Sequence, residues 1–290
     1  VYKRQTVNNP DSVAVAISIV FISIRISFPV VFTLLHIFVF FNISYHSYAT
    51  LLLKGDEILK YRRVLLKFSG EALSGSKDSG IDFDEVLNFA KEIKECAENG
   101  IEIAIVVGGG NFWRGKANPY MDRATSDYIG MLATTMNALA LGDAFKQIGQ
   151  DVRVQTGIEM RQVAEFYIKD RAIRHLEKGR ITIFGCGTGS PFFSTDTAAA
   201  LRAAEIKADA LIKATNVDGI YNKDPKQFED AEFIPHTSYL DVLNKKLKVM
   251  DSTAISLCME EEIPILVFNI HKPGNLHKLL LGEEIGSVVS

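Results

Sequence analysis

From residue 61 to the end, the sequence alternates between short β-branched runs and longer amphipathic segments. This alternation is typical of a mostly parallel sheet whose strands are joined by crossover helices. No repeat or low-complexity linker interrupts the pattern, so we predict one compact domain over residues 58–290. The predicted strands are Val64–Phe68, Glu102–Val107, Asp151–Gln155, Arg180–Phe184, Ala210–Lys213 and Pro264–Asn269.

Three helices are predicted between these strands. Asp82 is placed to cap the first, which ends before Gly100. The Ala-rich segment Ala198–Lys207 predicts another helix, with Thr195 and Asp196 near its start, where such side chains are preferred caps. The longest helix is predicted over Ser126–Ile148, and its apolar stripe is interpreted as facing the core rather than a cofactor: Ile129, Leu132, Met136, Leu139 and Ala140.

The first 57 residues have a different character. Val13–Leu53 is a nearly unbroken apolar run, and the composition changes abruptly at Lys54–Glu57. We expect 1–57 to be a non-native read-through product or an apolar N-terminal extension outside the fold. A membrane anchor is the alternative, because Val30–Ile43 with its flanks approaches the ~20 apolar residues that span a bilayer. A signal peptide fits less well, since no compact apolar core precedes a small-residue cleavage site.

Composition narrows the function classes. The formal net charge of −3 argues against a surface that coats nucleic acid, and 47% hydrophobic residues are enough for a sizeable core. Cys96, Cys186 and Cys258 are far apart and form no C-x-x-C pair. We therefore predict neither a disulfide framework nor a zinc site, and a reducing compartment fits best.

Three glycine-rich segments directly follow predicted strands: Ser69–Glu71, Gly108–Asn111 and Gly185–Asp196. Ligands of an open parallel sheet bind outside the carboxyl ends of its strands, and clustered backbone N–H groups there bind phosphate oxygens. One such segment alone is usually a tight turn. Three of them, with Lys67 and Arg114 beside them, favour phosphate chemistry.

The common nucleotide-binding motifs do not account for this pattern. The nearest approach to G-x-x-x-x-G-K-S/T is Gly70–Lys77, which ends in Ser-Lys rather than Lys-Ser. The G-x-G-x-x-G pattern fails at Ser190, and the H-R-D and D-F-G motifs of protein kinases are missing from the sequence. The sequence therefore indicates a phosphate-handling enzyme outside these classes.

Four segments resemble the bacterial UMP kinase family, a branch of the amino acid kinase superfamily: Val64–Leu73, Val106–Gly115, Gly187–Asp196 and Lys213–Gly219. The resemblance extends over about 61–290. It implies an α/β fold, a three-layer α/β/α sandwich with a central mostly parallel sheet. It also implies a cytoplasmic nucleoside monophosphate kinase that transfers the γ-phosphoryl group of ATP to UMP, giving UDP and ADP for pyrimidine and CTP biosynthesis.

The resemblance further implies two sets of binding residues. ATP would contact Lys67, Phe68, Ser69, Gly70, Gly110, Arg114, Thr215, Asn216, Tyr221 and Asp224. UMP would contact Gly109, Asp127, Thr188, Gly189, Ser190, Pro191, Phe192, Phe193, Ser194 and Thr195.

Regulation and assembly are implied by the resemblance alone. The segment associated with GTP activation corresponds to Gly75, Ser76, Lys77, Asp78, Ser79 and Gly80, whose outer glycines match while the interior differs. UTP would inhibit, and the family suggests a homohexamer built as a trimer of dimers.

Lys67 is our candidate for the principal cation that stabilises the transferred phosphoryl group, with Arg114 assisting. Asp196 would position Lys67 or orient the hydration shell of Mg²⁺, which ATP itself would mainly hold; no metal site on the protein is predicted. Asp196 is not expected to act as a base, because the acceptor phosphate oxygen needs no deprotonation. Asp251 is a weaker candidate for orienting the lysine, on resemblance.

Three other interpretations stay open at this point. The chain could be a superfamily member that phosphorylates a carboxylate, such as an acetylglutamate kinase, although Pro191–Phe193 argues against it. It could be a non-catalytic storage or sensor protein on the same fold, against which Lys67 and Asp196 argue. It could also be a membrane-tethered form of the kinase.

Overall fold

The computed structural model describes residues 60–115 and 120–290, which belong to one compact unit, Ile58–Ser290. The predictions made for residues 1–57 lie outside the described residues. In the described ranges, no helix is both long and apolar enough to cross a membrane.

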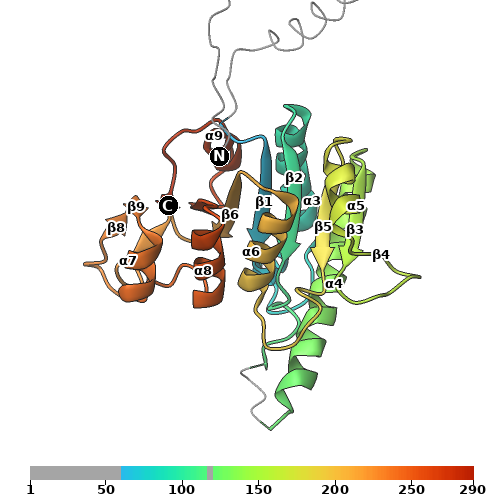
Figure 1. Ribbon diagram of the computed structural model, residues 1–290, viewed down its shortest axis with the longest axis horizontal. Helices are drawn as coiled ribbons and strands as arrows, with labels where there is room; N and C mark the ends of the chain where they lie inside the picture. The colour runs from blue at the N-terminus through green and yellow to red at the C-terminus, as the bar shows by residue number, and fades with distance from the viewer. Residues whose placement is uncertain (1–59, 116–119) are drawn as a thin grey trace, which may run out of the picture. The chain divides into compact units, whose positions relative to one another are not determined.

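A central sheet organises the unit (Figure 1). Its nine strands lie in the order β4-β3-β5-β2-β1-β6-β10-β11-β9 and are parallel except where β10 meets β11. A separate two-stranded ribbon joins β7 and β8. The strands are β1 (Arg63–Phe68), β2 (Glu102–Val107), β3 (Val152–Thr156), β4 (Glu165–Phe166), β5 (Ile181–Gly185), β6 (Ala210–Thr215), β7 (Ile220–Tyr221), β8 (Phe233–Ile234), β9 (His236–Thr237), β10 (Ile265–Asn269) and β11 (Ser287–Val289).

The six predicted strands all form, with ends that differ by at most two residues. The short strands β4, β7, β8, β9 and β11 were not predicted, because two or three residues are too few to show a period. Strand β1 pairs with β2 on one side and with β6 on the other. The chain order reverses at this point, which in open parallel sheets is where ligands bind.

Helices cover both faces of the sheet, so the predicted three-layer arrangement is confirmed. Helices α3, α4 and α9 pack on one face, and α5, α6, α7 and α8 pack on the other. A 3₁₀ turn, η1 (Gly70–Leu73), follows β1. The helices are α3 (Phe83–Glu98), α4 (Arg123–Gln147), α5 (Lys169–Leu176), α6 (Thr195–Ile206), α7 (Tyr239–Asn244), α8 (Ser252–Glu260) and α9 (Asn275–Leu280).

Local sequence sets the helix starts. Asp82 caps α3 as predicted, because its carboxylate accepts the Asp84 N–H at 3.2 Å. Ser194, rather than Thr195 or Asp196, caps α6, and its hydroxyl accepts the N–H groups of Asp196 and Thr197. Asp196 is thereby placed in the first turn of the helix, where its side chain is free for another role.

The prediction for the apolar stripe of α4 is wrong. Leu132, Met136 and Leu139 are 50%, 45% and 36% exposed, so they form an outer face rather than part of the core. The buried face combines the large apolar residues Met131, Leu141 and Phe145 with small or polar residues such as Thr134 and Ala138. Because both faces of the helix carry uncharged residues, its hydropathy pattern gives no reliable direction to the core.

Candidate active site

Two lysines face each other across one carboxylate at the carboxyl ends of the central strands. Lys67 on β1 and Lys213 on β6 are directly paired in the sheet register. Asp196, from the first turn of α6, lies with Oδ1 2.8 Å from Lys67 Nζ and Oδ2 3.3 Å from Lys213 Nζ. Lys67 is only 9% exposed, so its ammonium group has a fixed position and is not free in solvent.

The charges of this cluster alter one another. Burial alone would raise the pKa of Asp196, but the two lysines hold that pKa below its ordinary value. Burial, helped by the charge of Lys67 and opposed by Asp196, lowers the pKa of Lys213. The carboxylate is therefore kept ionised between two ammonium groups, an arrangement suited to orienting cations rather than to accepting a proton.

Lys213 was not among the predicted site residues. Its ammonium group also donates to the backbone carbonyl of Val249. A signal was present in the sequence, because Leu-Ile-Lys on β6 repeats the Leu-Leu-Lys pattern of β1. Two adjacent parallel strands with the same alternation bring the two lysines to one face at one level.

The first two glycine turns are in direct contact. A Cβ atom at Gly70 would lie 2.6 Å from the Gly108 carbonyl oxygen and 2.9 Å from the Gly110 nitrogen, so only glycine permits this approach. The Gly108 N–H also donates to the carbonyl of Phe68 at 3.0 Å. These contacts gather the backbone N–H groups of both turns at the ends of β1 and β2.

Helix α4 positions the second and third glycine turns together. A Cβ atom at Gly109 would lie 2.9 Å from Ala133 Cβ, so this turn packs against the helix. Thr134 Oγ1 accepts the N–H of Cys186 at 2.8 Å, and Thr135 Oγ1 lies 3.2 Å from its sulfur. Burial raises the pKa of the Cys186 thiol, which argues against a reactive nucleophile there.

The predicted ATP residues of the first two turns differ in what they can offer. Ser69 caps η1 by accepting the Ala72 N–H. The Phe68 side chain is 1% exposed and packs in the core beside Phe89, so only its backbone could reach a ligand. Arg114 lies at the exposed rim, with Nη2 2.5 Å from Glu71 Oε1 and Nε 3.4 Å from the Gly110 carbonyl oxygen.

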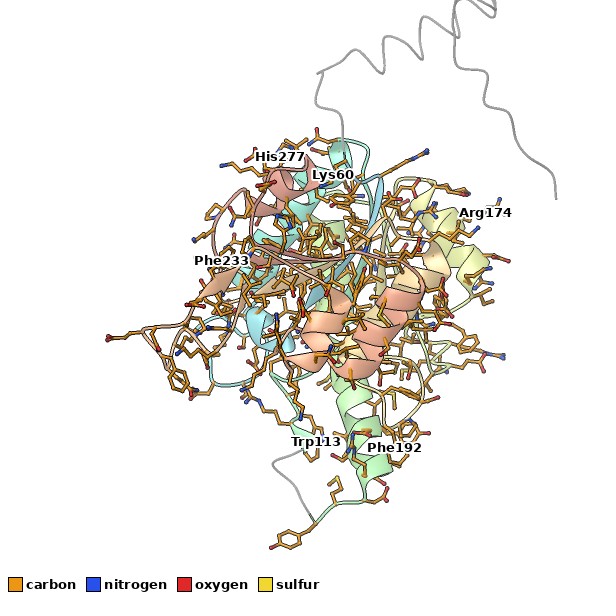
Figure 2. All side chains as sticks on the ribbon, turned by 60° about the vertical axis from the view of Figure 1, so that its left-hand side comes forward. Lys60, Trp113, Arg174, Phe192, Phe233 and His277 are labelled. Atoms are coloured by element: carbon orange, nitrogen blue, oxygen red, sulfur yellow. The ribbon has the colours of Figure 1, made fainter. Side chains whose placement is uncertain are left out.

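The loop 188–195 contains most of the predicted UMP residues and is open to solvent. Phe192 is 67% exposed and has a φ of 73°, which is unusual for a large side chain. Its N–H donates to Asp127 Oδ2 at 2.9 Å, and the same oxygen accepts from Arg123 Nε at 2.9 Å. Figure 2 shows Phe192 at the same end of the unit as Trp113, which lies in the chain between the second glycine turn and α4.

Asp251 contacts the start of α6 rather than a lysine. Its carboxylate accepts from the hydroxyls of Ser194 and Thr197 while capping α8 through the Ala254 N–H. Its negative charge also opposes the lowering of the Lys213 pKa, so Asp251 acts on the cluster both through the start of α6 and through its charge.

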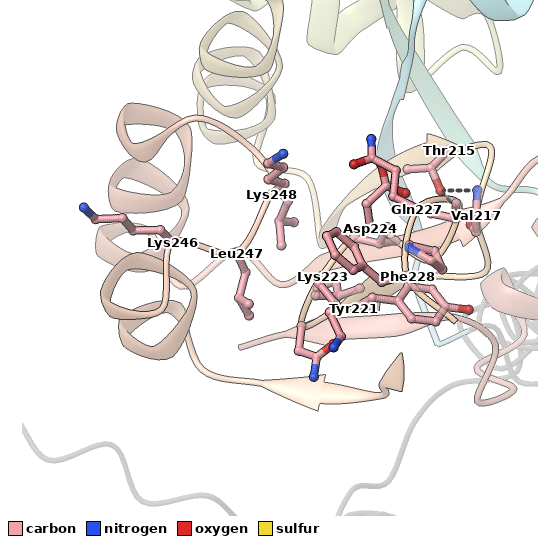
Figure 3. Close-up of a pocket in the computed structure, with 16 residues that line it drawn as sticks. Thr215, Val217, Tyr221, Lys223, Asp224, Gln227, Phe228, Lys246, Leu247 and Lys248 are labelled. Atoms are coloured by element: carbon pink, nitrogen blue, oxygen red, sulfur yellow. Dashed lines mark hydrogen bonds between the residues drawn. The ribbon is translucent and has the colours of Figure 1, made fainter. Parts of the chain in front are cut away.

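A pocket of about 450 Å³ opens beside the carboxyl end of β6 (Figure 3). Thr215, Tyr221 and Asp224, three of the predicted adenine and ribose residues, line it. Asn216 does not line it; the Asn216 side chain lies 3.0 Å from His271 Nε2. Residues that sequence reasoning missed supply much of the wall, among them Phe228, Leu247, Lys248, Val249 and Val267.

The segment Gly75–Gly80 lies on the surface next to the second glycine turn. The Gly80 N–H donates to the carbonyl of Asn111 at 3.0 Å. Lys77 pairs with Asp82 at 3.7 Å near the start of α3. Across 60–115 and 120–290, no cluster of three or more His, Cys, Asp or Glu side chains could hold a metal ion.

The family model described as the amino acid kinase family matches residues 62–269. Three solved structures are similar over nearly their whole length. A UMP kinase from Bacillus anthracis is 38% identical, with a TM-score of 0.77, over 79% of this chain and 96% of that one. A UMP kinase from Ureaplasma parvum is 36% identical, with a TM-score of 0.75, over 80% of this chain and 100% of that one. A uridylate kinase from Archaeoglobus fulgidus is 29% identical, with a TM-score of 0.61, over 78% of this chain and 99% of that one. The chain belongs to the amino acid kinase family.

Proposed function

We propose that the chain is a UMP kinase, which transfers the γ-phosphoryl group of ATP to UMP and releases UDP and ADP. The observation that carries this proposal is the Lys67–Asp196–Lys213 cluster beneath converging glycine turns, in a chain 38% identical to a UMP kinase. Transfer between two anionic nucleotides needs alignment and neutralisation of charge rather than a covalent protein group. The cluster and the turns supply groups of both kinds.

Lys67 and Lys213 stabilise the negative charge on the oxygens of the moving phosphoryl group. Their positions on neighbouring strands fix the two ammonium groups on one side of the transfer path. Asp196 holds both lysines in place and limits their mutual repulsion. Arg114 exchanges Glu71 for phosphate when ATP binds, because its exposed guanidinium can form two parallel hydrogen bonds to phosphate oxygens.

Mg²⁺ accompanies ATP in this proposal and is held by the nucleotide phosphates and water. The side chains around the site are consistent with Mg²⁺ bound by ATP and water. The carboxylate nearest the transfer site, Asp196, is already shared by two lysines, and the described residues contain no acidic cluster that could replace the phosphates as ligands.

UMP occupies the open side formed by Gly109, Asp127 and the loop 188–195. Asp127 is within reach of that loop through the Phe192 N–H, so it can hold a ribose hydroxyl and the loop together. ATP places its base in the 450 Å³ pocket, between apolar walls from Leu247 and Phe228 and the polar groups of Thr215 and Asp224.

Assembly is proposed through the outer face of α4. Tyr128, Leu132, Met136 and Leu139 recur at helical spacing and are 36–50% exposed. No charged side chain interrupts this helix between Asp127 and Asp143. A second copy covering this face would bury it and form a dimer contact, which would be one of the contacts in the homohexamer that the family resemblance suggests.

The remaining parts of the proposal follow the resemblance. They are cytoplasmic location, a step towards CTP, activation by GTP through Gly75–Gly80 and inhibition by UTP. We also propose that 58–290 is the amino acid kinase domain and that 1–57 is a non-native read-through product or an apolar N-terminal extension outside the fold.

An ADP-release assay on the full chain tests the proposed function. UMP, CMP, aspartate and acetylglutamate are offered separately with ATP and Mg²⁺, with and without GTP. We expect ADP release with UMP well above the other acceptors. Release with acetylglutamate or aspartate instead would identify a carboxylate kinase, and nucleotide binding without release would identify a sensor or storage protein.

A further inference from the structure

A pair of buried carboxamides lies behind the second glycine turn. Asn111 ends that turn and is 4% exposed, and Asn137 on α4 is fully buried. Asn137 Nδ2 donates to Asn111 Oδ1 at 2.7 Å, and Asn111 Nδ2 donates to Asn137 Oδ1 at 3.0 Å. The two side chains therefore hold each other by reciprocal hydrogen bonds.

The second N–H of each carboxamide binds a backbone carbonyl. Asn137 donates to Gly108 at 2.7 Å, and Asn111 donates to Gly80 at 2.7 Å. The Gly80 N–H returns a hydrogen bond to the Asn111 carbonyl at 3.0 Å. Every N–H of the pair is used, and a buried polar network with all its donors satisfied fixes one arrangement of its members.

The pair also contacts the first glycine turn. A Cβ atom at Gly70 would lie 2.4 Å from Asn111 Oδ1, so the glycine packs directly on the carboxamide. Asn111 thus contacts Gly70, while the pair binds Gly108 and Gly80. An apolar side chain at 137 could fill the same space, but it would leave the Gly108 carbonyl oxygen without its partner.

We infer that Asn111 and Asn137 are positioning residues for phosphoryl transfer, which also link the segment 75–80 to the glycine turn 108–110. Neither side chain needs to touch a nucleotide. They fix the position of the turn 108–110, whose N–H groups face the moving phosphoryl group. A displacement of Gly80 would move this turn through the Asn111 side chain, which binds the Gly80 carbonyl. The positioning role in phosphoryl transfer rests on the proposed function. The link between the segment 75–80 and the turn 108–110 does not depend on that function.

Two variants of the full chain test the positioning role. Asn137→Leu removes both donors without adding charge, and Asn137→Asp keeps the shape but points an oxygen at the Gly108 carbonyl. Since misplacement by about 1 Å can cost on the order of 10²-fold, we expect kcat to fall at least about ten-fold in both. KM for UMP should change by less than about three-fold, because the lost interaction acts mainly in the transition state.

Phe145→Leu is the matched control. Phe145 is fully buried on the same helix and packs in the core outside the proposed site. The smaller side chain should lower Tm as a cavity does, with wild-type kcat. An equal loss of kcat in this control would mean that any damage to α4 impairs the enzyme.

Hydrogen–deuterium exchange without nucleotides tests the link separately. In Asn137→Leu we expect faster exchange in both 75–80 and 106–113, whereas Phe145→Leu should affect α4 alone. A folded Asn137→Leu protein with wild-type kcat and unchanged exchange at 75–80 would overturn the inference. Absence of UMP-dependent ADP release in the wild type would overturn the proposed function, and the exchange result would still decide the link.

Discussion

The two sides of the candidate site are built differently. On the lysine side, Lys67 is 9% exposed, and every charged group of the cluster has a partner. On the opposite side, Phe192 is 67% exposed in a left-handed backbone conformation, held by an Asp127 that it shares with Arg123. The difference teaches that the buried lysine cluster is preorganised, whereas the exposed loop 188–195 is held by few contacts; we propose that this loop adjusts when UMP binds.

Lys67→Ala tests the preorganised side most severely. Loss of one fixed donor to the transferred group should lower kcat by about 10²–10³-fold, with the fold retained. Single-turnover kinetics with saturating ATP and UMP measure it, and circular dichroism checks the fold. Near-normal turnover in a folded variant would remove Lys67 from the transfer step and place the chemistry elsewhere.

Asp196→Asn tests whether the carboxylate stabilises the cluster itself. Two mostly buried ammonium groups would lose their counter-charge, which should cost on the order of 3 kcal/mol in the free energy of unfolding. Urea titrations measure this cost. Because the pKa of Asp196 is lowered in the folded protein, its contribution is complete above pH 3.8 and is lost as pH falls through the folded value. The variant should lack the loss of stability that protonation of Asp196 causes in the wild type at acid pH. If the free energy of unfolding falls with decreasing pH equally in both proteins, Asp196 does not stabilise the cluster by its charge.

Asp127→Ala tests the open side. We expect KM for UMP to rise about ten-fold, with a smaller change in kcat, because the lost contact holds the acceptor in ground state and transition state alike. Initial rates at varied UMP and fixed ATP measure it, and KM for ATP is the internal control. An unchanged KM for UMP would show that the loop 188–195 needs no help from α4.

Lys213→Arg should give the smallest effect at neutral pH. Burial lowers the pKa of Lys213, so the wild-type rate should decline with rising pH at values below 10.5 as the ammonium group loses its proton. An arginine stays protonated beyond pH 12, so in this variant the alkaline decline of kcat should shift to higher pH. Lys213→Met, with no charge at any pH, is the comparison. An unshifted decline in the arginine variant would assign the titration to another group.

The central part of this arrangement could be predicted from the sequence because it depends on local signals. Short β-branched runs gave strands within two residues of their true ends, and glycines after them indicated turns. The chemistry of the two side chains predicts that Asp196 either positions Lys67 or orients the hydration shell of Mg²⁺, and the structure brings its carboxylate within 2.8 Å of the lysine.

The rest depends on pairing between distant segments, which one sequence does not reveal. Lys213 joins the cluster only because β6 lies beside β1, and nothing local fixes that neighbour. The outward turn of Leu132 and Met136 is set by what packs on the other face of α4, where threonine and asparagine are buried because they bind the glycine turns. A hydropathy pattern assigns such polar residues to the surface.

The register between β1 and β6 has a consequence for how this chain can change. Side chains alternate between the two faces of a strand, so insertion or deletion of one residue in either strand would turn its lysine to the opposite layer of helices. The spacing between the ammonium groups is likewise tied to the separation of neighbouring strands, about 4.8 Å. Changes of substrate range are therefore expected in the surrounding loops, while the register of these two strands has to stay fixed for both lysines to meet Asp196.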